Sequence, residues 1–284
     1  MKRSLYALLS FLPDKPYLSL MYRRKLGKRM DWRNPVTFTQ KLQWLKVHDR
    51  NPLYTTLVDK AEVKDWVAGK IGAEHVIPTL GVWDRAEDIP FDALPAQFVL
   101  KPTHDSGALI ICRDKAMLDT AAARRQLKEA LNSSYYQVWR EWPYRDVRPR
   151  IIAEKYMEQP GAEALTDYKL FCFGGKPRVI LTVQGGHEDE RRVVRRLYDA
   201  HWQLLPVGLH GKDAVTQPEP RPALLEEMLH LARVLSEGMR QVRVDFYVIG
   251  GQIYFGEMTF YHMSGFETFR PDAYDKLLGD MMEL

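Results

Sequence analysis

Residues 242–260, VRVDFYVIGGQIYFGEMTF, combine a β-hairpin pattern with an arginine and two carboxylates. Apolar and polar side chains alternate on both sides of Gly250-Gly251, as expected for two paired strands around a turn. Arg243 and Asp245 share one face of the first strand, and Glu257 lies on the second strand. Carboxylate oxygens are preferred ligands of hard divalent cations. The hairpin is therefore a candidate site for a magnesium–nucleotide complex.

The pairing of the two strands decides whether the carboxylates meet. A two-residue loop at the glycine pair puts Asp245 and Glu257 on opposite faces of the hairpin. A three-residue loop with a bulge pairs Asp245 with Phe255 and Arg243 with Glu257, and both carboxylates then share a face. We expect this second pairing. The alternative without a site is a plain hairpin with a cross-strand Arg243–Glu257 ion pair.

The composition is that of a soluble globular enzyme. The chain has 284 residues, of which 45% are hydrophobic and 27% charged, enough to form one large core or two to three small ones. Cys112 and Cys172 lie in apolar, strand-like runs and have no CxxC partner. This predicts reduced core cysteines in a cytoplasmic protein, with no disulfide framework and no cysteine–metal site.

Positive charge is concentrated at the N-terminus. Residues 1–30 hold eight Lys/Arg and one acid, a net +7, so with +4 overall the remainder carries about −3. One interpretation is a solvated surface helix. The other is a patch for an acidic polymer or an anionic membrane surface. Leu5–Leu12 is too short to span a bilayer, and no signal-peptide cleavage pattern follows it.

The pattern of elements favours an α+β fold. Strands and helices alternate without the regularity of parallel βαβ units. Thr37 or Thr39 is expected to cap a helix that begins near Gln40. Further helices are expected over 57–71, 116–131 and 222–240, and strands over 76–80, 98–100, 109–112, 151–157, 168–173 and 178–183.

Four more segments carry residues able to bind a ligand, and each also has a simpler interpretation. Lys101 in FVLKPTHDSGALI can reach a phosphate while the backbone near Gly107 approaches its oxygens, or the segment is an ordinary hairpin. Glu154 in IIAEKYMEQ can accept from the exocyclic amine of a base, or form an edge-strand salt bridge. Lys169 in DYKLFCFGGKP shares a face with two phenylalanines, or is a snorkelling surface lysine.

The fourth segment, HEDERRVVRR, either captures a carboxylate or phosphate or is a solvated loop. The arginines concerned are Arg191, Arg192, Arg195 and Arg196. His104 and His262 show no metal-binding spacing and are interpreted as polar-loop residues.

The order of these segments is more specific than any one of them. Lys60, Lys101, Glu154, Lys169, the Arg243–Asp245 pair and Glu257 follow one another as in an ATP-grasp enzyme. The chain resembles that superfamily and, more closely, the TupA-like ATP-grasp family of bacterial surface-polysaccharide clusters. The resemblance covers nearly the whole chain, through the blocks NPVTFTQKLQWLKVHDRNPLYTTLVDK, LPAQFVLKPTHDSG, DYKLFCFGGKP and VRVDFY…YFGEMTF…SGFE.

The resemblance implies an ATP-grasp fold, in which two α+β subdomains grip ATP. It implies an N-terminal helical and small α/β region over 1–95, a first ATP-grasp subdomain over 96–157, and a second over 158–284 with the magnesium-binding hairpin.

It also implies an ATP-dependent carboxylate–amine ligase that forms an amide through an acyl-phosphate. Its substrates would be an amino acid or amine and a hexuronic acid of a surface polysaccharide. The expected location is the cytoplasm, in contact with the inner face of the membrane through the basic N-terminus, and no nucleic-acid partner is expected. The alternatives are a phosphotransferase, a glycosyltransferase and a non-catalytic binding module.

The cofactors implied are ATP and Mg²⁺, and the resemblance assigns a role to each site residue. Catalytic roles fall to Arg243, Lys101 and Lys169. Nucleotide contacts fall to Lys60, Lys101, His104, Ser106, Gly107, Glu154, Lys155, Met157 and Lys169. Metal ligation falls to Asp245, Glu257 and Thr259, although many ATP-grasp enzymes have Asn where this chain has Thr259. Either Glu158 or Glu163 would bind the ribose.

Overall fold

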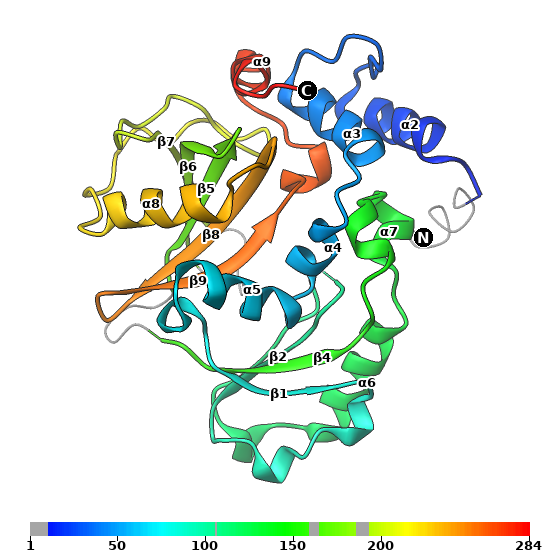
Figure 1. The fold of residues 1–284 in the computed structure, drawn as a ribbon, viewed down its shortest axis with the longest axis vertical. Helices are drawn as coiled ribbons and strands as arrows, with labels where there is room; N and C mark the ends of the chain where they lie inside the picture. The colour runs from blue at the N-terminus through cyan, green and yellow to red at the C-terminus, as the bar shows by residue number, and fades with distance from the viewer. Residues whose placement is uncertain (1–10, 106, 159–164, 186–192) are drawn as a thin grey trace. The chain divides into compact units, whose positions relative to one another are not determined.

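The computed structural model describes residues 11–105, 107–158, 165–185 and 193–284 (Figure 1). These residues form two compact units. Unit 1 contains Arg50–Met157, and unit 2 contains Phe11–Asp49 together with Glu158–Leu284. The sequence-based division treats residues 1–95 as one region, whereas residues 11–49 pack in unit 2 and residues 50–95 pack in unit 1.

Unit 1 is built on a four-stranded antiparallel sheet with strand order β1-β4-β2-β3. One side of this sheet carries the core, in which Phe98, Leu100 and Ala153 pack with Leu127 of α6. Its strands are β1 (Thr79–Trp83), β2 (Phe98–Pro102), β3 (Ile110–Cys112) and β4 (Ile151–Lys155). Its helices are α4 (Leu53–Val58), α5 (Glu62–Ile71), α6 (Thr120–Leu131) and α7 (Tyr135–Trp139).

The helix predicted over residues 57–71 is instead two helices, α4 and α5. Asp59 separates them, because its Oδ1 accepts the backbone N–H groups of Ala61 at 2.8 Å and Glu62 at 3.3 Å. These bonds form a turn at Asp59, two residues before Ala61, the residue at which α5 is capped. Arg150 holds the other oxygen of Asp59 at 2.8 Å. The helical spacing of apolar residues continues across this break, so a prediction from periodicity alone treats the two helices as one.

Unit 2 is built on a five-stranded antiparallel sheet with strand order β7-β6-β5-β8-β9. Helix α8 (Leu225–Leu235) packs on β5, β6 and β8 (Figure 1) and buries Leu225, Met228 and Leu235. The strands are β5 (Asp167–Phe173), β6 (Lys176–Gln184), β7 (Val194–Asp199), β8 (Gln241–Ile249) and β9 (Gln252–Thr259). The predicted hairpin in DYKLFCFGGKP is confirmed as β5–β6.

The N-terminal helices join unit 2 through buried polar contacts. These helices are α2 (Asp14–Leu26) and α3 (Phe38–His48), and α9 (Ala273–Asp280) contacts α3. Thr37 caps α3 in a capping box with Gln40, which confirms one of the two predicted caps. The carboxylate of Asp275 accepts from the Thr39 backbone N–H at 2.8 Å and from its hydroxyl at 2.7 Å.

Short 3₁₀ segments complete the described secondary structure. They are η1 (Ala73–His75), η2 (Ala86–Asp88), η3 (Phe91–Ala93), η4 (Lys115–Met117), η5 (Trp142–Arg145) and η6 (His262–Gly265). Two antiparallel sheets with helices packed on them make an α+β fold, as predicted. Cys112 and Cys172 are buried free thiols, also as predicted.

Candidate active site

The β8–β9 hairpin pairs differently from the expected register. Its loop is the two-residue Gly250-Gly251 turn, and Ile249 pairs with Gln252. A bulge farther along then shifts the register, so that Asp245 pairs with Glu257 and Arg243 with Thr259. The predicted pairs, Asp245 with Phe255 and Arg243 with Glu257, are therefore wrong.

The extra residue of the bulge is Gly256, because Phe255 already pairs with Phe246. A Cβ atom at this position would lie 3.1 Å from the Tyr247 ring and 3.2 Å from the Asp245 carbonyl oxygen. A glycine in a strand often marks such a bulge. The bulge, and not a longer turn, brings Asp245 directly opposite Glu257.

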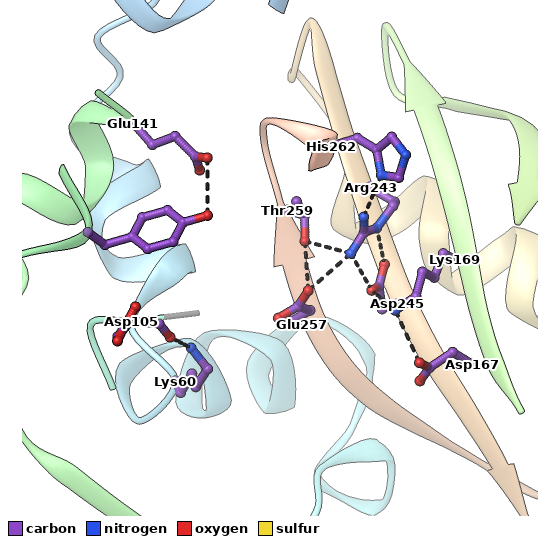
Figure 2. Close-up of polar contacts among 11 residues, drawn as sticks. Lys60, Asp105, Glu141, Asp167, Lys169, Arg243, Asp245, Glu257, Thr259 and His262 are labelled. Atoms are coloured by element: carbon purple, nitrogen blue, oxygen red, sulfur yellow. Dashed lines mark hydrogen bonds and ion pairs between the residues drawn. The ribbon is translucent and has the colours of Figure 1, made fainter. Parts of the chain in front are cut away.

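Three oxygen-bearing side chains of the hairpin converge on one nitrogen of Arg243 (Figure 2). Nη2 of Arg243 donates to Asp245 Oδ2 at 2.7 Å, to Glu257 Oε1 at 3.0 Å and to Thr259 Oγ1 at 3.0 Å. Nε of Arg243 also donates to Asp245 Oδ1 at 2.7 Å. The three predicted metal ligands thus already surround one cationic atom. The cross-strand Arg243–Glu257 ion pair is present as well.

Lys169 brings a second cation to the same face. Its Nζ lies 2.7 Å from Asp245 Oδ2 and 3.3 Å from Asp167 Oδ2. Burial opposes the charged form of this lysine, yet the facing carboxylate of Asp245 raises the pKa of Lys169 above its ordinary value. Three carboxylates, Asp167, Asp245 and Glu257, face two cations, which leaves one excess negative charge.

This donor set suits a hard cation that brings other ligands with it. The described residues contain no group of three or more His, Cys, Asp or Glu side chains that would enclose a metal ion. Magnesium usually keeps several waters and takes one or two carboxylates plus phosphate oxygens. Two carboxylates and a hydroxyl, gathered around a cationic nitrogen, match that requirement. The Glu257 side chain is 41% exposed, whereas Asp245 is buried.

His262 and Glu267 extend this site inward. Nδ1 of His262 lies 2.8 Å from Nη1 of Arg243, and its Nε2 lies 3.3 Å from Glu267 Oε2. Burial lowers the pKa of His262, and the neighbouring Arg243 charge lowers it further. Although burial acts in the opposite direction, the hydrogen bond and charge of His262 hold the pKa of Glu267 below its usual range.

In unit 1, Lys101 and Glu154 form part of a buried ion triad. Glu154 Oε2 lies 2.5 Å from Lys101 Nζ, and its Oε1 lies 2.6 Å from Lys64 Nζ. Burial would raise the pKa of Glu154, but Lys101 and then Lys64 lower it overall. Glu154 on β4 pairs with Val99 on β2, which brings these residues together. Glu154 therefore forms salt bridges, as in the simpler interpretation, but the edge-strand part of that interpretation is wrong, because β4 lies between β1 and β2.

The loop after β2 carries the remaining candidates of unit 1. The Lys60 ammonium contacts the Asp105 carbonyl oxygen (Figure 2). His104 is buried, its Nε2 lies 3.3 Å from the Ser133 carbonyl oxygen, and burial lowers its pKa. Gly107 has φ +147° and no atom within 4 Å of where a Cβ would lie, so its backbone is open to approach. Ser106 lies outside the described residues.

The other predicted residues are spread more widely. Lys155 ends β4, where its backbone N–H donates to the Pro78 carbonyl oxygen at 3.0 Å. Arg196 is held by Glu219 and by the Gln217 carbonyl oxygen. Met157 is half-buried and Glu158 is exposed. Glu163, Arg191 and Arg192 lie outside the described residues.

Sequence reasoning missed Lys64, Asp167, His262 and Glu267. Two of them carried a usable signal. Lys64 lies one helical turn after Lys60 in DKAEVK, and Asp167 alternates with Lys169 on one face of β5. His262 and Glu267 carried none, because the contact of His262 with Arg243, and that of Glu267 with His262, depend on the turn that follows β9.

Two antiparallel sheets with helices packed on them place the protein in the α+β class. The family model for TupA-like ATP-grasp matches residues 40–283. The chain therefore belongs to the TupA-like ATP-grasp family, as predicted. ATP-grasp ligases use ATP and Mg²⁺, so the predicted cofactors agree with the family. No curated protein matches the chain.

Solved structures similar to the chain include two ligases and a synthetase. D-alanine–D-alanine ligase from Bacillus anthracis complexed with ATP is 19% identical over 80% of this chain and 63% of that chain, with a TM-score of 0.45. The ATP-grasp ligase PsnB complexed with minimal precursor, Mg and ADP is 13% identical over 78% of this chain and 57% of that chain, with a TM-score of 0.40. N5-carboxyaminoimidazole ribonucleotide synthetase from Thermus thermophilus is 14% identical over 72% of this chain and 45% of that chain, with a TM-score of 0.41. The chain spans less than two thirds of each.

Proposed function

We propose that the protein is an ATP-dependent carboxylate–amine ligase that joins an amino acid or amine to a hexuronic acid of a bacterial surface polysaccharide. The observation that carries the proposal is the convergence of Asp245, Glu257 and Thr259 oxygens on Nη2 of Arg243. It occurs in a chain that matches the ATP-grasp family over residues 40–283.

The proposed reaction has two steps. A carboxylate oxygen of the acceptor attacks the γ-phosphorus of ATP, and ADP leaves with the electrons of the broken P–O bond. The amine nitrogen then attacks the acyl carbon, loses a proton, and displaces phosphate to leave an amide. Negative charge develops on the phosphoryl oxygens in the first step, and on the acyl oxygen of the tetrahedral intermediate and then the departing phosphate in the second, so fixed cations are the main catalytic requirement.

The residues of unit 2 meet that requirement. Arg243 would stabilise charge on the transferring phosphoryl group and on the tetrahedral intermediate, since its guanidinium is already fixed by Asp245. Lys169 would neutralise a phosphate oxygen. When bound, Mg²⁺ would neutralise phosphate charge, and Asp245, Glu257 and Thr259 would hold it.

The residues of unit 1 would hold the nucleotide. Lys101 would neutralise a phosphate, with Lys60, His104, Ser106 and Gly107 contributing from the following loop. Glu154, with the backbone of Lys155 to Met157, would bind adenine, and Glu158 or Glu163 the ribose. Lys101 and Glu154 contact each other in the structure, so each would exchange that contact for one with the nucleotide.

The test combines the purified protein with ATP, Mg²⁺, uronate acceptors and amino acids, and measures ADP release together with the mass of the amide. We expect ADP release that requires both the amine and the carboxylate. Glu257→Gln should abolish it, while the matched substitution Glu226→Gln, at an exposed position of α8, should not. ADP release without an amine would indicate a phosphotransferase, and no amide from any pairing would contradict the ligase.

The basic N-terminal segment supports a proposed contact with the inner face of the membrane. Every described helix is too short or too polar to cross a bilayer. Helix α2 ends with exposed Arg23, Arg24 and Lys25, and its Leu20 side chain is also exposed. Sedimentation with anionic vesicles, but not with neutral vesicles, would support this contact. Equal sedimentation of the Arg23→Glu/Arg24→Glu variant would contradict it.

A further inference from the structure

His262 contacts the guanidinium of Arg243 on the side away from the carboxylates. Nη1 of Arg243 lies 2.8 Å from His262 Nδ1. A guanidinium has only hydrogen-bond donors, so Nδ1 must be the acceptor. The proton of the neutral imidazole is therefore on Nε2. Figure 2 shows His262 beside Arg243 in this arrangement.

Glu267 faces the other side of the His262 ring. Its Oε2 lies 3.3 Å from His262 Nε2, and its Oε1 accepts the backbone N–H groups of His210 at 2.8 Å and Thr268 at 2.7 Å. The Phe171 ring packs edge-on against the imidazole, with the ring centroids 5.0 Å apart. His262 and Glu267 are both almost fully buried. The contact with Arg243 thus sets the tautomer of the imidazole, and the packing of Glu267 and Phe171 around the ring limits its orientation.

The backbone that carries His262 is held in a rare conformation. Met263, Ser264 and Gly265 follow it with φ values of 47°, 52° and 69°. Each non-glycine residue in this left-handed region costs about 1–2 kcal/mol, and such strain persists only where surrounding contacts impose it.

Helix α3 supplies those contacts. The Ser264 carbonyl oxygen accepts from Gln43 Nε2 at 3.0 Å and from Lys46 Nζ at 2.9 Å. Lys46 Nζ also bonds Ser264 Oγ at 2.8 Å, and Gln43 Nε2 donates to the Gly265 carbonyl oxygen at 2.9 Å. The Lys46 side chain is fully buried. Two buried side chains thus keep the turn in the conformation that presents His262 to Arg243.

We propose that His262 and Glu267 are positioning residues that hold Arg243 in place when its carboxylate partners take up a metal ion. In the described structure four residues accept hydrogen bonds from Arg243, and three of them are the candidate metal ligands. His262 is the fourth. Because it is neutral, it holds the guanidinium without competing for the positive charge that Arg243 offers to a phosphoryl group.

This inference rests on the proposed function, and its test therefore has one arm without turnover. That arm measures solvent exchange of the Arg243 guanidinium protons by NMR in the protein alone, with signals assigned by their loss in Arg243→Lys. His262→Leu removes the acceptor, and loss of one hydrogen bond should speed exchange by about tenfold. His262→Gln retains an acceptor oxygen and should exchange nearly as slowly as wild type. Equal exchange rates in wild type, His262→Leu and His262→Gln would overturn the inference.

The second arm measures turnover and binding in the same variants. His262→Leu should lower kcat for amine-dependent ADP release by about 10–100-fold, while calorimetric affinity for ATP with Mg²⁺ stays within about threefold. His262→Gln should recover most of kcat. His75→Leu, the same substitution at a buried histidine of unit 1, is the matched control and should leave kcat unchanged.

The two proposals fail in different ways. Wild-type protein without ATP turnover would contradict the ligase, and the exchange arm would then decide the positioning role. Wild-type turnover together with an unchanged kcat in His262→Leu would overturn the positioning role alone. A fall in ATP affinity in step with kcat in that variant would indicate a merely structural histidine and would also overturn it.

Discussion

Replacing Glu154 by glutamine should destabilise the protein far more than the loss of an ordinary surface ion pair. The Glu154 carboxylate lies 2.6 Å from Lys64 Nζ and 2.5 Å from Lys101 Nζ. The three side chains are only 7%, 11% and 19% exposed, respectively. Removal of the central charge leaves the ammonium groups of buried Lys64 and partly buried Lys101 close together without an anion.

The magnitude follows from this geometry. At an effective dielectric constant of about 20, each contact gains about 6 kcal/mol of Coulomb energy, most of which offsets the cost of desolvation. Breaking a buried ion pair by removing one partner typically costs about 3–5 kcal/mol. At about 2–4 °C per kcal/mol, the melting temperature should fall by about 6–20 °C.

Urea and thermal unfolding followed by circular dichroism measure this loss. The matched control is Glu87→Gln, which breaks an exposed Lys128–Glu87 pair in the same unit and should leave the unfolding free energy close to that of wild type. A loss of less than about 1 kcal/mol in Glu154→Gln would refute the reasoning, because the triad would then behave as a surface ion pair.

Three further predictions concern other parts of the structure. The folded-state pKa of His262 is lowered from 6.5, so the stability that its neutral form contributes is present above pH 6.5 and lost as the pH falls. The unfolding free energy of wild type should therefore fall faster below pH 6.5 than that of His262→Gln, by up to about 1.4 kcal/mol per pH unit, and parallel pH profiles would contradict this. Burial raises the pKa of the Cys172 thiol to about 12, so a thiol reagent at pH 8 should label it only on unfolding, and rapid labelling of native protein would show that it is accessible. Gly69 lies inside α5, with no atom within 4 Å of where a Cβ would be. Gly69→Ala should therefore raise the unfolding free energy by about 0.5–1 kcal/mol, and a decrease would show that the helix does not tolerate a side chain there.

The hairpin shows how far the sequence alone leads. The alternation of residues 242–260 correctly predicted two strands, and the expectation that Asp245 and Glu257 share a face is confirmed, since they pair directly. The predicted register was wrong because the sequence is compatible with two loop lengths. The prediction placed the bulge at the turn, whereas the structure places it at Gly256. Local patterns predict that a bulge is needed, but packing around Gly256 decides where it lies.

Long-range contacts account for most of the other differences. Nothing near His262 indicates that it would meet Arg243, because the contact depends on a left-handed turn held by Gln43 and Lys46, more than 200 residues earlier in the chain. The assignment of residues 11–49 to unit 2 likewise depends on Asp275, which binds Thr39 across 236 positions. Such contacts leave no periodic signal in the sequence.

The measurement that tests the central claim most directly is calorimetric titration of ATP, with and without Mg²⁺, into wild type, Glu257→Ala and the control Glu226→Ala. The account predicts micromolar-range binding that depends on Mg²⁺, is weakened in Glu257→Ala and is unchanged in the control. Absence of nucleotide binding in wild type, or binding that Glu257→Ala leaves unchanged, would contradict the assignment of the Arg243–Asp245–Glu257 hairpin as the magnesium–ATP site.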